Sequence, residues 1–104
     1  MTKIVILLCM AGCAAALAVP ALAAGPTVRV KDNFFKAKTV HVRKGTTVTW
    51  RWAGSRRHDV TFRRFHSTLK KKGSYKHKFT KRGTYHYFCS VHSSEGMTGK
   101  VVVK

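Results

Sequence analysis

Three side chains that bind soft metal ions lie close together near the C-terminal end of this 104-residue chain. Cys89 offers a thiolate, His92 an imidazole and Met97 a thioether, and the polar residues between them predict a loop that can bring the three together. Sulfur and imidazole ligands favour copper, and two histidines, one cysteine and a weak axial methionine form the set used for electron transfer. The spacing therefore predicts a copper site that still needs one histidine.

His58 is the histidine best placed to complete this set. It follows a polar turn at residues 53–57 and begins an alternating segment at residues 58–62, whose end can lie beside Cys89. We therefore predict that His58 joins the three donors above, with the methionine as the weak axial ligand. The other histidines are expected to be surface or partly packed side chains: His41, His66, His77 and His86.

Other interpretations of the donor cluster fit its composition less well. Zinc takes nitrogen, oxygen or thiolate ligands and seldom a thioether. A reactive thiol needs a helix N-terminus or a strongly basic partner, and the sequence predicts no helix. The simplest alternative is a packed strand end followed by a polar turn. A multinuclear copper enzyme would need a second cysteine near Cys89 or many more histidines, so we do not expect an enzyme.

The elements that must position these donors are predicted to be short β-strands. From Thr27 onward apolar and polar residues alternate with a period of two, the pattern of a half-buried strand, and turn residues separate about seven such segments. The alternating positions are Val28 and Val30, Val40 and Val42, Val48 to Trp52, Val60 and Phe62, Tyr75 to Phe79, Tyr85 to Cys89, and Val101 and Val103. The sequence thus predicts one small all-β domain, an antiparallel sandwich or barrel.

An export signal is predicted at the N-terminus. Residues 4–24 are apolar or small, and a small-residue cleavage motif ends at Ala23. Cleavage there removes residues 1–23 and leaves residues 24–104 as a domain whose only thiol is Cys89. An uncleaved membrane anchor or a lipoprotein signal are the alternatives. All three place the domain outside the cytoplasm, in the periplasm, secreted or at the cell surface.

The chain is strongly basic, with 21 Lys and Arg against 3 Asp and Glu and a formal net charge of +18. Such a surface is attracted to anionic partners, such as an acidic redox protein, a cell-surface polymer or a membrane surface. Nucleic acid is disfavoured, because the leader predicts export and the aromatic residues fall on core positions. Arg56 and Arg57 are expected at the docking surface near His58, and Lys70 and Lys71 farther from it.

The chain from Val28 to Val103 resembles the plastocyanin-like branch of the cupredoxins, the blue copper proteins. The resemblance is carried by Gly-Thr-Thr-Val-Thr-Trp at 45–50, His-Asp-Val-Thr-Phe at 58–62, and Gly-Thr-Tyr-His-Tyr-Phe-Cys at 83–89 followed by Cys-x2-His-x4-Met. It implies a Greek-key β-sandwich with one type 1 copper ion bound by His58, Cys89, His92 and Met97.

The resemblance also implies a function and exposes two departures. An exported monomer that carries single electrons between redox proteins is the expected function, and a copper carrier that delivers metal without relaying electrons is the alternative. The family usually has asparagine where this chain has Asp59, and relatives commonly have asparagine where it has Trp52. The asparagine after the first histidine is taken to tie the two ligand loops together, so Asp59 calls that link into question.

Overall fold

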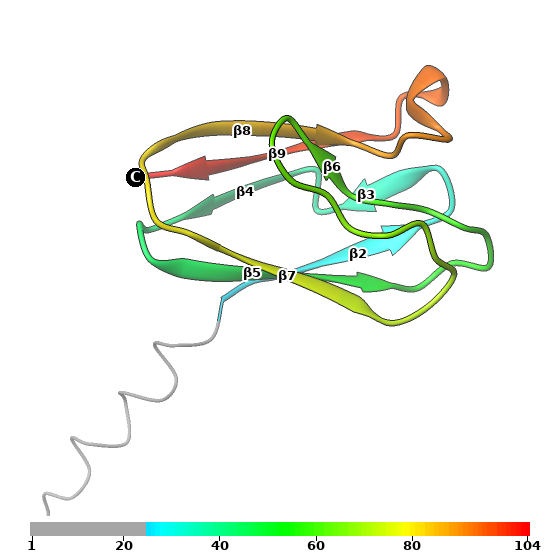
Figure 1. Ribbon diagram of the computed structural model, residues 1–104, viewed down its shortest axis with the longest axis horizontal. Helices are drawn as coiled ribbons and strands as arrows, with labels where there is room; N and C mark the ends of the chain where they lie inside the picture. The colour runs from blue at the N-terminus through cyan, green and yellow to red at the C-terminus, as the bar shows by residue number, and fades with distance from the viewer. Residues whose placement is uncertain (1–24) are drawn as a thin grey trace, which may run out of the picture.

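A computed structural model describes residues 25–104, which form two facing β-sheets with the core between them (Figure 1). The predicted leader, residues 1–23, lies outside the described residues. The elements are β2 (Thr27–Lys31), β3 (Phe34–Lys36), β4 (Thr39–Val42), β5 (Thr46–Trp52), β6 (Thr61–Phe62), β7 (Ser74–Phe79), β8 (Gly83–Phe88), the 3₁₀ helix η1 (Ser93–Glu95) and β9 (Thr98–Val103). No helix in this part of the chain has the length and apolar content needed to cross a membrane.

One sheet has the strand order β3-β2-β5-β7 and the other β4-β9-β8-β6. The predicted all-β sandwich is therefore confirmed, with eight described strands where about seven were expected. The expectation of a wholly antiparallel arrangement was wrong, because β2 runs parallel to β5 and β4 runs parallel to β9. Alternation of apolar residues identifies the buried face of a strand, but it does not reveal the direction of the neighbouring strand.

Two segments differ in extent from the sequence prediction. The strand β3 was not expected, since its three residues are too few to show a period, although Phe35 is buried between exposed neighbours. The strand predicted at residues 58–62 is reduced to β6, and His58 instead makes an isolated bridge with Lys70. The donor histidine therefore lies on an irregular segment that precedes β6.

The core is centred on Trp50 of β5, which is fully buried. The rings of Phe62 and Tyr87, from the opposite sheet, lie 5.6 Å and 5.5 Å from it in edge-to-face arrangements. Such aromatic pairs contribute about 0.5–1.5 kcal/mol each beyond the burial of their area. Burial also raises the pKa of Tyr87 to about 12, so its phenol stays neutral inside the sandwich. These contacts join the two sheets behind the donor residues.

The pairing of β6 with β8 brings the two halves of the predicted site together. Thr61 lies opposite Phe88, and Phe62 lies opposite Tyr87. Along β8 Tyr87 faces the core and Phe88 is exposed, so Cys89 faces the core again and is fully buried, as the period of two predicts. The residues before β6 consequently lie beside the residues after β8.

Candidate metal centre

The predicted donors lie at one end of the sandwich, on the right in Figure 1, which we call the donor end. Three segments form it: residues 32–33 between β2 and β3, residues 53–60 between β5 and β6, and residues 89–97 between β8 and β9. β2 and β5 are parallel, so the residues that follow them lie at the same end of the sandwich. β6 and β8 are antiparallel, so the residues before β6 lie beside the residues after β8. These strand pairings bring together side chains that are far apart in the sequence.

The loop at residues 89–97 is folded tightly on itself by backbone hydrogen bonds. The amide of Cys89 donates to the carbonyl of Met97 at 3.0 Å, and the amide of His92 donates to the carbonyl of Cys89 at 3.2 Å. Gly96 ends η1 with φ of +84°, a left-handed conformation that favours glycine and turns the chain back towards β9. Cys89 and Met97 are fully buried, whereas His92 is half-buried.

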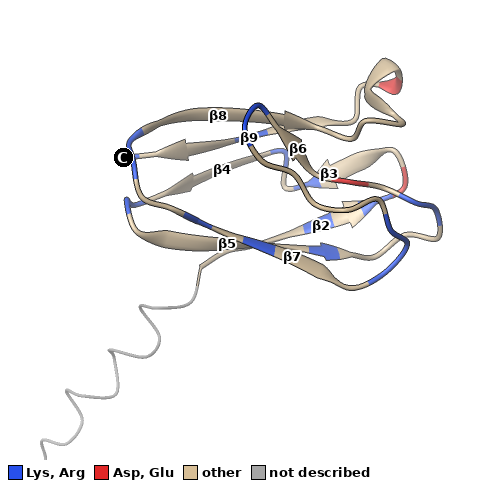
Figure 2. Cartoon of the chain, viewed as in Figure 1, with Lys and Arg blue, Asp and Glu red and all other residues tan. Residues whose placement is uncertain are grey.

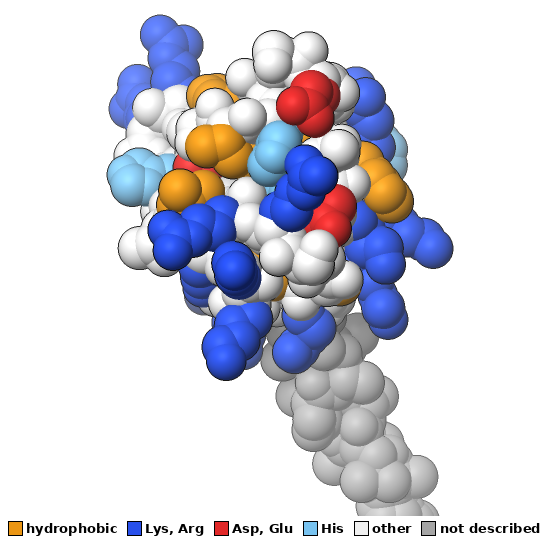
Figure 3. Space-filling view, turned by 90° about the vertical axis from the view of Figure 1, so that its right-hand side faces the viewer, with side chains coloured by type: hydrophobic (Ala, Val, Ile, Leu, Met, Phe, Trp, Pro, Cys, Tyr) orange, Lys and Arg blue, Asp and Glu red, His pale blue; other side chains and the backbone are white. Residues whose placement is uncertain are grey.

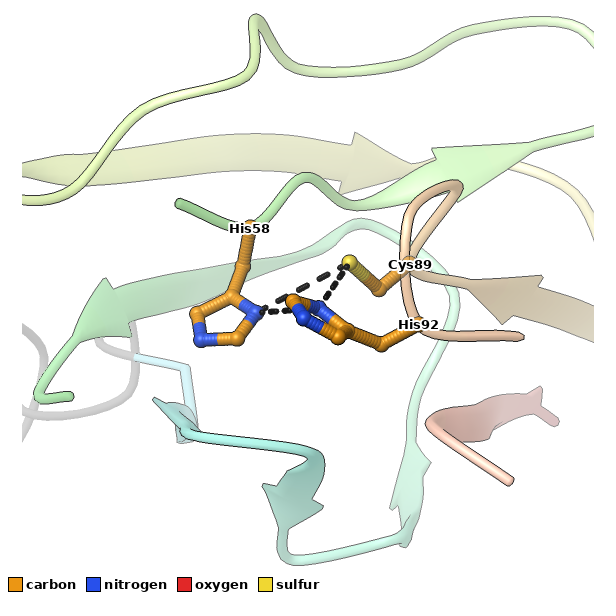
Figure 4. Close-up of side chains that lie close together, drawn as sticks. All are labelled: His58, Cys89 and His92. Atoms are coloured by element: carbon orange, nitrogen blue, oxygen red, sulfur yellow. Dashed lines mark hydrogen bonds between the residues drawn. The ribbon is translucent and has the colours of Figure 1, made fainter. Parts of the chain in front are cut away.

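Three donor atoms converge at this end (Figure 4). His58 Nδ1 lies 3.1 Å from His92 Nδ1, and Cys89 Sγ lies 3.8 Å from the first and 3.6 Å from the second. A point about 2.0 Å from all three atoms exists at the centre of this triangle, which is the length of a metal–nitrogen bond and close to that of a metal–sulfur bond. A single metal ion therefore fits between these three side chains.

The backbone of His58 is fixed by contacts with two other segments. Its backbone forms two hydrogen bonds with Lys70, at 2.9 Å and 3.1 Å, and the indole Nε1 of Trp52 donates to its carbonyl at 3.0 Å. Lys70 also places its ammonium 4.7 Å from the centre of the Trp52 ring. The expectation that Lys70 lies far from the site was wrong. Trp52, which stands where relatives commonly have asparagine, is buried in the core and also holds the donor histidine through its indole N–H.

Asp32 is a member of the site that the sequence did not reveal. Its Oδ1 lies 2.9 Å from His58 Nε2, on the opposite side of the ring from the converging donors. Hydrogen bonds from His58, then from the amides of Arg56 and Ser55, hold the pKa of the Asp32 carboxyl well below its usual range. Within residues 25–104 the contact between Asp32 and His58 is the only one at salt-bridge distance between an acidic and a basic side chain.

Asp59 links the two donor loops, the role that the resemblance gives to asparagine. Its Oδ1 accepts a hydrogen bond from the amide of Ser90 at 2.7 Å, and its Oδ2 accepts one from the Ser90 hydroxyl at 2.5 Å. The carboxylate thus joins the residue after His58 to the residue after Cys89. Both oxygens are used, so the link is at least as extensive as an amide side chain could make to these groups.

The remaining histidines lie elsewhere, and none belongs to the cluster that the described residues form around Cys89. His77 stacks on Phe65 with ring centres 3.7 Å apart, and burial lowers its pKa. His66 Nδ1 lies 2.8 Å from the carbonyl of Ser67. Cys89 is the only thiol in the part of the chain that the structure describes.

Comparison with known proteins gives this arrangement its context. The model of copper binding proteins of the plastocyanin/azurin family matches residues 26–104. A reduced Cu(I) form of an amicyanin variant matches with a TM-score of 0.70 and 32% identity, over 77% of this chain and 82% of amicyanin. An oxidised amicyanin variant matches with a TM-score of 0.70 and 31% identity over the same shares. A purple cupredoxin from Nitrosopumilus maritimus, at 23% identity and a TM-score of 0.70 over 77% of this chain and all of its own, shares the fold.

The fold and the donor cluster together define a cupredoxin. The chain belongs to the plastocyanin/azurin family of copper binding proteins. Its arrangement of His58, Cys89, His92 and Met97 is consistent with one type 1 copper site. The matched family includes both plastocyanin and azurin, so assignment to the plastocyanin-like branch stays a prediction.

Proposed function

We propose that this protein is an electron carrier that holds one copper ion through His58, Cys89, His92 and Met97. The observation that carries the proposal is the convergence of His58 Nδ1, Cys89 Sγ and His92 Nδ1 around a point at bonding distance from all three. Bound copper supplies a one-electron couple between Cu(II) and Cu(I). The protein's own contribution is to hold the donors still and to keep water away from them.

The hydrogen bonds around the donors support rapid electron exchange. Trp52 and Lys70 fix the backbone of His58, and Asp59 fixes the Cys89 loop through Ser90. Donors that are held from outside keep their positions when the charge of the ion changes. Cys89 and Met97 are buried, and the half-buried His92 is the donor nearest to solvent. We assign the exposed edge of His92 as the route by which electrons enter and leave.

A role in electron transfer also explains why we propose no enzymatic activity. Catalytic metal sites keep a coordination position open for water or substrate. The four proposed ligands here supply a complete set from protein side chains, and three of the four are fully buried. This donor set is suited to passing electrons and leaves no coordination position for a substrate.

We further propose that the domain at residues 24–104 works outside the cytoplasm as a monomer, after loss of the leader at residues 1–23. Its partner is proposed to be an acidic redox protein that docks at the donor end, where Figure 3 shows hydrophobic, basic and two acidic side chains around a surface histidine. The formal charge of +18 supports an anionic partner. The same charge would also hold the protein near an anionic polymer or membrane surface.

Titration of the purified protein with Cu(II) tests this function. An electron carrier should turn intensely blue through charge transfer from the Cys89 thiolate, and it should bleach and recover reversibly through many cycles of reduction and oxidation. Cys89→Ser should bind copper weakly and stay colourless. A colourless wild-type complex that transfers its copper rapidly to a competing chelator would overturn the proposal and favour a copper carrier.

A further inference from the structure

The two ring nitrogens of His58 face different groups. Nδ1 faces Cys89 and His92, and Nε2 faces Asp32 at 2.9 Å. An ionised carboxylate can only accept a hydrogen bond, so the proton of a neutral His58 must lie on Nε2. The lone pair then lies on Nδ1, which is the form in which the imidazole can bind a metal ion. The contact with Asp32 thus selects the tautomer that the site needs.

The carboxylate of Asp32 is held by hydrogen bonds from the turn between β5 and His58. The amides of Ser55 and Arg56 donate to its carboxylate at 3.1 Å and 3.0 Å, and the Ser55 hydroxyl donates at 3.0 Å. Gly54 lies directly against the carboxylate, and a Cβ at this position would overlap Asp32 Oδ1. The turn between β5 and His58 can therefore enclose the carboxylate only because residue 54 has no side chain. Three donors other than His58 order the carboxylate, so its position relative to His58 is well defined.

The charge of Asp32 matters because carboxylates are scarce in this chain. Only three are present against 21 basic side chains, and all three lie at the donor end, as Figure 2 shows: Asp32, Asp59 and Glu95. The excess of positive charge disfavours the more positive state of a bound ion. Asp32 is the one carboxylate that contacts a donor imidazole directly, so it opposes that effect through the ring of His58.

We propose that Asp32 is a positioning residue that holds His58 in its metal-binding tautomer and stabilises Cu(II) relative to Cu(I). This inference rests on the proposed copper function. A carboxylate that accepts the second N–H of a ligating histidine increases the basicity of the ligand, and loss of such partners typically costs about 10–100-fold in metal affinity. The greater basicity favours Cu(II), the state with the higher charge. Asp32 accordingly lowers the reduction potential of the site.

The Asp32→Asn variant tests the contribution of charge with little change in shape. The asparagine oxygen can still accept the proton of His58 Nε2 and the backbone amides, whereas the negative charge is gone. We expect the ratio of Cu(II) to Cu(I) affinity to fall about tenfold, a rise of about 59 mV in the potential measured by voltammetry. Glu95→Gln is the matched control, because it removes a carboxylate from the same end and the Glu95 side chain makes no hydrogen bond or ion pair within residues 25–104. Its shift should be less than twofold.

The Asp32→Ala variant tests positioning separately. Nitrogen NMR of the metal-free full chain should show one His58 tautomer, with its proton on Nε2, in wild type and in Asp32→Ala a mixture of both. A potential that rises equally in Asp32→Asn and Glu95→Gln, or a single Nε2–H tautomer in Asp32→Ala, would overturn the inference. If wild type itself failed to form a blue, redox-active complex, the proposed function would fail, while the tautomer measurement would still report on Asp32.

Discussion

The two histidines that face Cys89 are held in opposite ways. His58 is fully buried and is fixed by Asp32, Trp52 and Lys70, all of which come from other segments. His92 is half-buried and lies in a short loop whose own backbone turns fix its position. One side of the site is therefore built by tertiary structure and the other by local structure. The two sides therefore have different roles. The contacts of His58 set the reduction potential of the ion, and the exposed edge of His92 gives electrons access to it.

Replacing each histidine by glycine should reveal the difference between the two sides most clearly. His92→Gly leaves an opening to solvent, so added imidazole should enter and restore the blue colour. His58→Gly leaves a hole in a closed interior, with a loss of about 3 kcal/mol of unfolding free energy by analogy with other large-to-small core substitutions. Absorbance during imidazole titration and urea unfolding of both variants measure these effects. Equal recovery by imidazole would show that the two sides are equally open.

Copper binding should stabilise the protein, and it should rigidify the loop that carries His92 more than the segment that carries His58. An ion that binds only the folded state raises the unfolding free energy by about 4 kcal/mol at a free concentration of 1,000 times its dissociation constant. Amides in residues 89–97 should gain more protection from hydrogen exchange than those near His58, which is already held by Lys70 and Trp52. Thermal melts and exchange with and without copper test both statements. Identical melting temperatures would mean that the metal binds outside the native fold.

Asp59 connects the two sides, so its substitution separates charge from mechanical linkage. Asp59→Asn should keep a hydrogen bond to the Ser90 amide and raise the potential, because a nearby negative charge is lost. Asp59→Ala should in addition remove the acceptor of the Ser90 amide and cost about 1 kcal/mol, because Ser90 is exposed and water can partly replace the lost hydrogen bond. Voltammetry and denaturant unfolding distinguish the two effects. A lower potential in Asp59→Asn would indicate that the geometry of the loops outweighs the charge.

The smallest expected effect concerns docking at the donor end. Encounter with an acidic redox protein should slow as salt rises from 0.01 M to 0.1 M, because the Debye length falls from about 30 Å to about 10 Å. Arg56→Ser with Arg57→Ser should weaken this dependence more than Lys81→Ser with Arg82→Ser, which removes the same charge from the turn between β7 and β8 at the opposite end. Stopped-flow rates against ionic strength measure the difference. If the two double variants behave alike, the charge acts diffusely and there is no defined docking surface.

The His92 side could be predicted from sequence because its information is local. Cys89, His92 and Met97 lie within one loop, and the alternation along β8 correctly predicts that Cys89 faces the core. The strands were also evident from their period of two. What alternation reports is the buried face of each strand, and that is a property of the strand alone.

The His58 side was predicted only in part, since its contacts join distant segments. His58 was identified from its turn and the need for a second imidazole, but Asp32 follows a different strand and had no pattern to mark it. The parallel pairing of β2 with β5 is what brings Asp32 to His58, and the sequence contains no signal for that pairing. Lys70 was misplaced for the same reason, because its bridge to His58 lies outside any regular strand.

The contact between His58 and Asp32 is the only one of its kind in the part of the chain that the structure describes, and this has a consequence for the rest of the molecule. No lysine or arginine among residues 25–104 lies in an ion pair, so these side chains are not neutralised from within, and their mutual repulsion weakens the folded state. Dissolved counterions must supply the neutralisation that the protein does not. The salt that slows encounter with an acidic partner therefore also stabilises the fold. Fast encounter favours low ionic strength, whereas stability of the folded state favours high ionic strength.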